Sequence, residues 1–506
     1  MSEKKEYSPK MQELFERVAE FTDLQHIMAV LGWDQQTYMP PGGAEERGLQ
    51  MAALGRILHE KFATETFGQL ITDLEDEVGD LNADTDEARS VKVVKKSYEK
   101  QVKVPLPLLM ETIKAQTLGH EAWVKARAQS DFSIFKPHLE TLVELRKQYA
   151  ELFTPYDHIY DPLLDDFEPG MKTADVKEIF EKLRPQQVAL LQEIAEKEPP
   201  DNSFIKHHYN DEHQELFGRH VITCFGYDWQ RGRLDVAPHP FTTEFGLGDV
   251  RITTRYLKDD AGSALFGTMH ESGHAMYAQG VPEKYKRHPL GGAASLAIHE
   301  SQSRLWENII GRSKEFWSYF YPSFQMLFSE YLADVSLIDF YRGINRVEPS
   351  FIRVEADEAT YNMHIMLRLE IEIGLMEGTM NVGDLPEIWN SKMQEYLGIT
   401  PPNDALGVLQ DIHWSGGSIG YFPTYALGNL ASVQLWNKLL EENPNVPDEI
   451  ARGKFETVLA WMRENVHKYG SKYEPQEIML KATGNKIDPA PYMAYLRKKY
   501  TEIYNL

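Results

Sequence analysis

The pentapeptide His270-Glu271-Ser272-Gly273-His274 combines two imidazoles and a carboxylate at a spacing that suits metal binding on a helix. At about 3.6 residues per turn, His270 and His274 lie one turn apart on the same face, so both can reach one ion. Glu271 lies one step round the helix, where its carboxylate can take a proton from water that the ion activates. Apolar residues at helical spacing and two stop signals surround the motif: Leu265, Phe266, Met269, Met276, Tyr277, Gly280 and Pro282. This context favours a metal site over a chance match.

A catalytic zinc site has three protein ligands and an open position, so a third donor must lie elsewhere in the chain. We expect Glu300 to be that donor, because Ala293 to Ile310 is predicted to form a second helix facing the first. His299 is the alternative, although a carboxylate is the commoner third ligand of this pentapeptide. A structural zinc site would more often be closed by thiolates, and Cys224 is the only cysteine. The residues therefore favour a catalytic site.

Composition limits the classes of partner. The chain has 506 residues, with 53 Lys and Arg against 77 Asp and Glu, which gives a formal net charge of −24. Such acidity argues against nucleic acid or an anionic membrane surface as the main partner. One cysteine forms no intrachain disulfide, no apolar run approaches the roughly 18 residues of a membrane span, and the first residues are charged. We expect a cytoplasmic protein.

The elements that position the motif are mostly helices. Apolar residues recur at steps of three and four from Pro9 to about Gly32, and similar periodicity continues in four further segments: Glu45 to Leu58, Leu108 to Ser130, His138 to Phe153 and Lys172 to Lys197. The breaks between them are too short to be linkers between independent domains. The sequence predicts a mainly α-helical chain that folds as a single catalytic domain over residues 1–506.

One segment departs from the helical pattern just before the metal motif. Val236 to Phe245 and Asp249 to Tyr256 are short and alternating, and Gly246-Leu247-Gly248 joins them, which predicts a small antiparallel hairpin. An edge strand beside the metal helix could hold an extended peptide through main-chain hydrogen bonds. A purely structural hairpin explains the same pattern equally well.

Several strings in fixed order resemble one family, the thermostable metallocarboxypeptidases (M32) typified by a Thermus aquaticus enzyme, and are close to its bacillary members. The matching strings are Leu31 to Pro40, His239-Pro240-Phe241, Asp249 to Thr253, the metal pentapeptide, His299 to Gln302 and Gly407 to Trp414. They span nearly the whole chain. The resemblance implies a two-lobed helical zincin with a deep groove, similar in outline to neurolysin and angiotensin-converting enzyme, and with the small sheet beside the metal helix.

The resemblance also implies an activity and partners. The expected function is a zinc-dependent carboxypeptidase, with cobalt as a possible substitute, that releases single C-terminal residues from peptides with broad preference. The expected assembly is a homodimer. In this reading the ligands are His270, His274 and Glu300, and Glu271 is the general base. The preferred C-terminal side chain and the physiological peptides are not specified by the sequence.

Further site residues are candidates with structural alternatives. Family analogy points to His413 and Tyr421 as donors to the oxyanion of the reaction, although both side chains could simply pack in the core. A planar guanidinium is the best receptor for a terminal carboxylate, and we assign Arg353 to that role and leave Arg368 as structural. His239 is a candidate to line the groove and bind substrate, although we favour a purely structural role for it.

Three other functions share parts of this pattern. A zinc endopeptidase would use the same ligands and Glu271 without a receptor for a terminal carboxylate. An aminopeptidase is disfavoured because the Gly-Ala-Met-Glu-Asn string typical of that class is absent. A binding protein braced by metal is disfavoured because Glu271 is present and thiolates are few. The carboxypeptidase remains the preferred interpretation.

Overall fold

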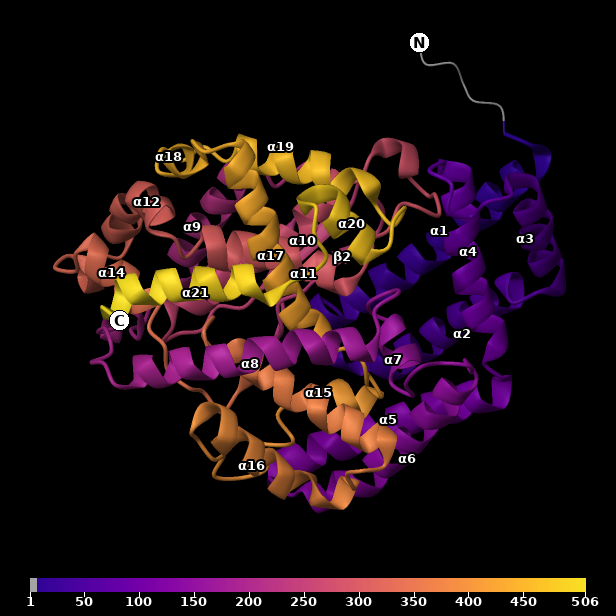
Figure 1. The fold of residues 1–506 in the computed structure, drawn as a ribbon, viewed down its shortest axis with the longest axis horizontal. Coiled ribbons are helices and arrows are strands. Elements are labelled where there is room, and N and C mark those ends of the chain that lie inside the picture. Colours follow the sequence, from indigo (N-terminus) through magenta and orange to yellow (C-terminus); the bar gives the residue numbers. More distant parts are fainter. Residues whose placement is uncertain (1–6) are drawn as a thin grey trace, which may run out of the picture.

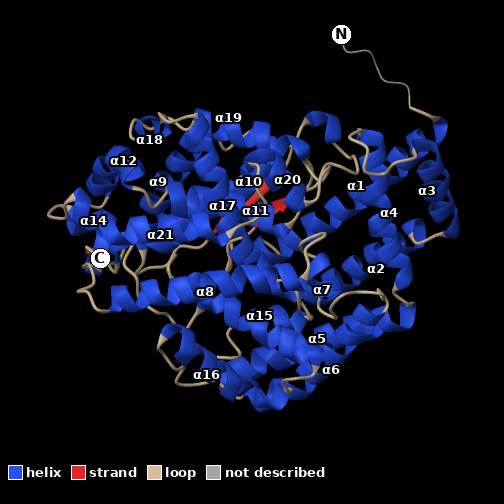
Figure 2. Cartoon of the chain, in the orientation of Figure 1, coloured by secondary structure: helices blue, strands red, loops and turns tan. Residues whose placement is uncertain are grey.

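The computed structural model describes residues 7–506, which form a mainly helical body with one small sheet (Figure 1 and Figure 2). The predicted fold class is confirmed. The α-helices of the first half are α1 (Pro9–Thr37), α2 (Ala44–Phe62), α3 (Glu65–Val78), α4 (Asp86–Lys103), α5 (Leu106–Gln129), α6 (Phe132–Glu151), α7 (Asp161–Asp165), α8 (Thr173–Ala195) and α9 (Asp211–Phe225). Those of the second half are α10 (Ala261–Gly280), α11 (Leu296–Arg304), α12 (Lys314–Leu327), α13 (Ser329–Leu332), α14 (Leu337–Ile344), α15 (Tyr361–Glu377), α16 (Leu385–Leu397), α17 (Pro423–Glu442), α18 (Val446–Ile450), α19 (Glu456–Asn465), α20 (Pro475–Thr483) and α21 (Pro489–Tyr504).

The first four helices pack around a core of their own. Each of α1, α3 and α4 begins at a Ser or Thr whose hydroxyl accepts a hydrogen bond from a backbone N–H of the first turn. Their apolar faces meet in a cluster of Met11, Leu14, Phe62, Phe67, Leu70, Ile71, Leu74, Val91 and Val94. In Figure 1 these helices lie together on the right, away from α12 and α14 on the left.

A second and larger core joins the rest of the chain. It runs from α5 to α21, and its largest fully buried side chains include Trp306, Trp317 and Trp389. Helices α10, α11 and α17 cross near its centre, where α11 packs against both of the others. These three helices are therefore held on most sides by other helices, which fixes the side chains they carry.

The sheet has three strands in the order β1-β3-β2 and lies against α10. Its strands are β1 (Leu234–Val236), β2 (Thr242–Glu244) and β3 (Val250–Thr254). The predicted antiparallel hairpin is confirmed for β2 and β3, in the register Thr242 to Ile252 and Glu244 to Val250. The prediction that the first strand starts at Val236 is wrong, because Leu234–Val236 pairs in parallel with the other edge of β3.

Helix α10 begins at a strong cap. The Asp260 carboxylate accepts hydrogen bonds from the N–H groups of Gly262 at 2.7 Å and Ser263 at 3.1 Å. Such a cap stabilises a helix by about 1 kcal/mol. None of the helices in residues 7–506 combines the length and the apolar character that crossing a membrane requires.

Candidate metal centre

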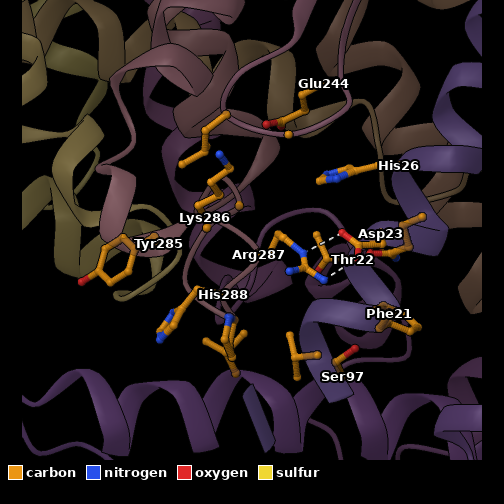
Figure 3. A pocket seen from close by; sticks show the side chains of 18 of the residues that line it. Phe21, Thr22, Asp23, His26, Ser97, Glu244, Tyr285, Lys286, Arg287 and His288 are labelled. Carbon is orange, nitrogen blue, oxygen red and sulfur yellow. Dashed lines mark hydrogen bonds and ion pairs between the residues drawn. The ribbon is translucent and has the colours of Figure 1, made fainter. Parts of the chain in front are cut away.

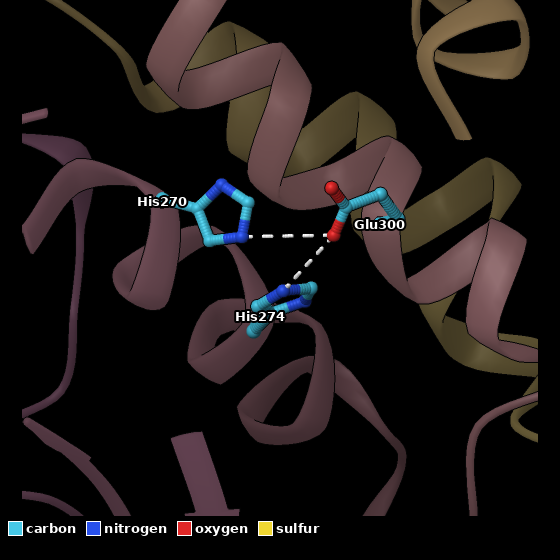
Figure 4. Close-up of side chains that lie close together, drawn as sticks. All are labelled: His270, His274 and Glu300. Carbon is cyan, nitrogen blue, oxygen red and sulfur yellow. Dashed lines mark ion pairs between the residues drawn. The ribbon is translucent and has the colours of Figure 1, made fainter. Parts of the chain in front are cut away.

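Three side chains from two crossing helices form the candidate metal centre. His270 and His274 lie one turn apart on α10, and Glu300 on α11 points between them (Figure 4). The Oε2 atom of Glu300 is 3.6 Å from Nε2 of His270 and 3.4 Å from Nε2 of His274. Two ligands at typical zinc distances in a tetrahedral site are about 3.4 Å apart. The spacing and the donor types therefore fit a divalent ion held by these three residues.

The crossing of α10 and α11 depends on a glycine. A Cβ atom on Gly273 would lie 2.6 Å from Cα of Ser303 and 2.7 Å from the carbonyl oxygen of Gln302. Gly428 allows α17 to approach the other side of α11 equally closely, because a Cβ atom at this position would lie 2.6 Å from Cβ and Cγ of Glu300. Both helices that flank α11 can come this close only where they carry glycine. This packing sets the distance between Glu300 and the two histidines.

Each histidine has a partner on its second nitrogen. Nδ1 of His270 is 2.8 Å from Oε2 of Glu307, which lies in the π-helix Leu305–Ile310 that continues α11. Nδ1 of His274 is 2.6 Å from Nδ1 of His299. Burial lowers the pKa of His299 to about 3, so this ring is neutral and one of its nitrogens can accept. Such contacts fix the orientation of metal-binding imidazoles and leave their Nε2 atoms free.

The position of His299 bears on the question of the third ligand. It lies in α11 one residue before Glu300 and packs beside His274 on the side of Nδ1, away from Nε2. The group of potential ligands in residues 7–506 consists of His270, His274 and Glu300, whose ligand atoms all lie within 4.8 Å of one another. The geometry thus favours Glu300 over His299 as third donor.

Arg304 balances the acidic side chains behind the ligands. Its Nε donates to Oε1 of Glu300 at 2.6 Å, and its Nη1 lies 3.3 Å from Oε2 of Glu307. Burial raises the pKa of Glu300, but Arg304 and the two histidines outweigh that effect and hold this pKa well below its usual value. The same balance between burial and Arg304 lowers the pKa of Glu307 to about 2. Both carboxylates are therefore ionised at neutral pH.

Glu271 lies at the edge of the sheet. The hydroxyl of Thr242 on β2 is 2.6 Å from Oε2 of Glu271 and 3.0 Å from its carbonyl oxygen. Within residues 7–506 the other carboxylate oxygen of Glu271 has no hydrogen-bond partner. The short sheet therefore contacts the candidate base directly. The sequence predicted only that the sheet lies beside the metal helix.

The glycine-rich segment after α16 brings an aromatic group to the same site. His413 lies in a 3-10 helix, and its ring centroid is 5.1 Å from that of Tyr421. Its Nε2 is 3.4 Å from the hydroxyl of Tyr425, which the sequence analysis did not assign. Burial, with help from Arg353, lowers the pKa of His413 to about 4, so the ring is neutral. Burial raises the pKa of both tyrosines, and the charge of Glu300 raises it further. Tyr425 packs edge-on against Tyr361, whose ring centroid lies 4.4 Å from the guanidinium of Arg304.

Arg353 and Arg368 share one carboxylate. Nε and Nη2 of Arg353 donate to Oδ1 of Asp411 at 3.0 and 2.9 Å, and Arg368 donates to Oδ2. Nη1 of Arg353 also donates to the hydroxyl of Tyr361 at 2.8 Å. Two guanidinium groups facing one carboxylate leave an excess positive charge at this end of the site. Burial lowers the pKa of His239, and the nearby charges of Arg255 and Arg353 lower it further.

Comparisons with known proteins agree on one family. The model of the carboxypeptidase Taq (M32) metallopeptidases matches residues 13–500. The chain is 40% identical to thermostable carboxypeptidase 1 of Thermus thermophilus over 97% of this chain and 98% of the relative. It is 39% identical to carboxypeptidase 1 of Bacillus subtilis, with 99% of each covered. The M32 carboxypeptidase of Deinococcus radiodurans superposes with a TM-score of 0.94 at 37% identity, covering 98% of this chain and all of the other.

Replacing Gly273 with Ala tests the helix crossing. We expect Gly273→Ala to push α11 away from α10, which lowers the free energy of unfolding by about 1–3 kcal/mol and weakens metal binding. Gly267→Ala on the same helix is the control, because its Cβ would meet only Pro240 Cγ at 3.9 Å. Metal content and thermal unfolding of both variants check this. Equal metal affinity in the two variants would contradict the role given to Gly273.

Replacing Glu307 with Gln tests the support of His270. An amide is a weaker acceptor than a carboxylate, so we expect Glu307→Gln to reduce metal affinity by about 10–100-fold with the ligands intact. The exposed Glu315 supplies a control of equal charge change, Glu315→Gln. Titration with a competing chelator measures both affinities, and an unchanged value for Glu307→Gln would remove this residue from the site.

Proposed function

The chain belongs to the carboxypeptidase Taq (M32) metallopeptidase family, and we propose that its metal is zinc and that it releases C-terminal residues from peptides with broad preference. Membership makes it a metallocarboxypeptidase, a peptide hydrolase. The observation that carries the proposal is the group of His270, His274 and Glu300, whose spacing suits a tetrahedral ion with one open position. Cobalt is a plausible substitute because it binds the same donors.

His270, His274 and Glu300 would hold the ion. When bound, it supplies Lewis acidity, which polarises a carbonyl group and makes water acidic enough to ionise near neutral pH. Glu307 and His299 keep the two imidazoles in position from behind. Arg304 keeps Glu300 ionised, so that this carboxylate is ready to bind a cation.

Glu271 is the proposed general base and acid. The Thr242 hydroxyl holds one of its oxygens, which leaves the second oxygen to accept a proton from water. The same carboxyl then returns the proton to the leaving amine as the peptide bond breaks. A positioned base of this kind contributes about 10²–10⁴-fold to the rate.

Two aromatic side chains are proposed to stabilise the oxyanion. A neutral His413 can donate a hydrogen bond from its ring, and Tyr421 or Tyr425 can donate from a hydroxyl. Donors aimed at developing charge in a site with little water are worth about 2.7–4 kcal/mol each in related chemistry. Tyr421 keeps the role assigned from sequence, and Tyr425 joins it because its hydroxyl is the nearest to His413.

The proposed receptor for the terminal carboxylate is the cationic end of the site. Arg353 and Arg368 face a single Asp411, so one positive charge remains without a matching carboxylate. His239 lies beside Arg353 and Arg255 and would line this end. A free C-terminus placed here would supply the missing negative charge, which explains why an exopeptidase carries this arrangement.

Strand β2 is proposed to hold the peptide backbone. Bonds to β3 come from Phe241 and Phe245, so the alternation of an antiparallel ladder turns the N–H and C=O groups of Thr242 and Glu244 toward the free edge. An extended peptide can add a strand there. The remaining parts of the proposal are a single two-lobed catalytic domain with a deep groove, a homodimer and a cytoplasmic location.

Changing Glu271 to Gln tests the base. We expect Glu271→Gln to bind metal normally, because the three ligands remain, and to lose at least about 10²-fold in kcat. Mass spectrometry of a defined peptide, with metal content measured on the same sample, checks both statements. Near-normal turnover in this variant would show that another group takes the proton.

Changing Arg353 to Ala tests the carboxylate receptor. We expect Arg353→Ala to raise KM for a peptide with a free C-terminus by about 10–100-fold, since a hydrogen bond between charged groups contributes about 1.5–3 kcal/mol. The C-terminal amide of the same peptide should change far less. Both substrates are measured on one preparation, so a loss of folded protein affects them equally. An equal loss on both would exclude Arg353 from this role.

A further inference from the structure

A carboxylate on the strand beside the catalytic residues has no partner. Glu244, the last residue of β2, forms no hydrogen bond or ion pair with any side chain in residues 7–506. Enclosure by the surrounding protein raises its pKa to about 7, and no neighbouring cation offsets that effect. The side chain is half-buried and borders a pocket, so its unpaired carboxyl group is accessible to a ligand.

Glu244 lines a pocket of about 600 Å³ between the first helices and the sheet. Figure 3 shows Glu244 and His26 at the pocket, with Asp23 and Arg287 paired across it. The pocket walls also include apolar side chains from α1, α4 and the turn between β2 and β3, among them Phe21, Val94 and Leu247. A ligand with an apolar stem and a charged tip fits this combination of surfaces.

The other charged residues at the pocket are already neutralised. Arg287 donates to both oxygens of Asp23. Arg251 donates to both oxygens of Asp249 at 2.8 Å. Lys286 lies 3.4 Å from Glu283. Glu244 therefore has no counter-ion among these groups, and the ligand it suits is a cation, which favours the ionised form of its carboxyl group.

The strand relates this pocket to the site of hydrolysis. Residues two apart in a strand face the same side, so Glu244 and Thr242 point the same way. Thr242 contacts Glu271, and two residues of strand span about 7 Å. A peptide paired with β2 therefore places at Glu244 a residue about two positions from the one opposite Thr242.

Charge also sets the direction of that peptide. The cations Arg353 and Arg255 lie beside His239, which precedes β2, whereas Glu244 ends the strand. A peptide with its free carboxylate at the cationic end must run antiparallel to β2. Its upstream residues then extend toward Glu244 and the pocket.

We propose that Glu244 forms a subsite for a positively charged group on the upstream part of the peptide. The group is an ammonium or guanidinium, carried by a Lys or Arg side chain or by the peptide's own amino terminus. This inference rests on the proposed function and adds to it a preference for cationic short peptides. Charge-assisted hydrogen bonds to a carboxylate supply the discrimination.

The experiment compares peptides that differ only in one charge. Acetylated alanine hexapeptides carry Lys, or acetyl-lysine as its neutral form, at each successive position upstream of the C-terminal residue. We expect the wild-type protein to show kcat/KM about 10-fold higher for Lys than for acetyl-lysine at one of these positions. Glu244→Gln should reduce this ratio to within about twofold. Because the ratio is taken on one preparation, it does not depend on the folded fraction.

The matched control is Glu283→Gln, which removes an exposed carboxylate near the pocket rim with the same change in net charge. It should keep the 10-fold ratio. A second arm compares alanine peptides of increasing length with free and acetylated amino termini. A preference for the free amine at a single length, abolished by Glu244→Gln, identifies the amino terminus as the source of the cation.

Two results would overturn the subsite. One is a Lys to acetyl-lysine ratio near one at every position, together with no preference for a free amino terminus at any length. The other is a preference that Glu244→Gln leaves intact or that Glu283→Gln abolishes equally. In both cases mass spectrometry would still show peptides shortened from the carboxyl end, so the proposed function stands. Absence of such shortening with every peptide would overturn the proposed function and the subsite together.

Discussion

The ionised carboxylate of Glu300, removed from water at the crossing of two helices, determines how the centre of this protein is built. Burying a charge is costly unless a partner compensates for it. Arg304 compensates on one oxygen, and the other oxygen points between the Nε2 atoms of His270 and His274. Glycines on α10 and α17 allow the helices to approach closely enough for this arrangement. Glu307 and His299 contact the second nitrogens of the two imidazoles, which fixes the orientation of the ligand atoms.

Basic and acidic side chains lie at the two ends of strand β2, on either side of this centre. Arg353 and Arg368 around a single Asp411 leave an excess of positive charge near His239, and Glu244 places an unpaired carboxyl group at the far end of β2. A peptide has the complementary polarity, with a carboxylate at one end and an amine at the other. The free edge of β2 runs from the cationic end to Glu244, and Thr242 on this strand contacts Glu271. The proposed cleavage at the carboxyl end thus follows from where each charge lies relative to the base.

Sequence was sufficient where the determinants are local. The spacing of His270 and His274 follows from helix geometry, and the return helix with Glu300 follows from its apolar period. The hairpin of β2 and β3 followed from alternation and glycines. The separate strand β1 was not predicted, because the parallel contacts of a three-residue strand leave no local pattern. The partners of the histidines could not be named from the sequence. Glu307 lies on a different helical segment from His270, and the π-helix that contains it changes the direction of its side chain relative to a regular α-helix. The contact of Arg353 with Asp411 likewise joins distant segments.

The most direct test of this account is a crystal structure of the protein grown with zinc, with anomalous scattering measured at the zinc edge. The account predicts one strong peak about 2.0–2.2 Å from Nε2 of His270, Nε2 of His274 and Oε2 of Glu300, with a fourth position open to solvent. A peak elsewhere, or these three side chains turned away from a common point in the presence of saturating zinc, would contradict it.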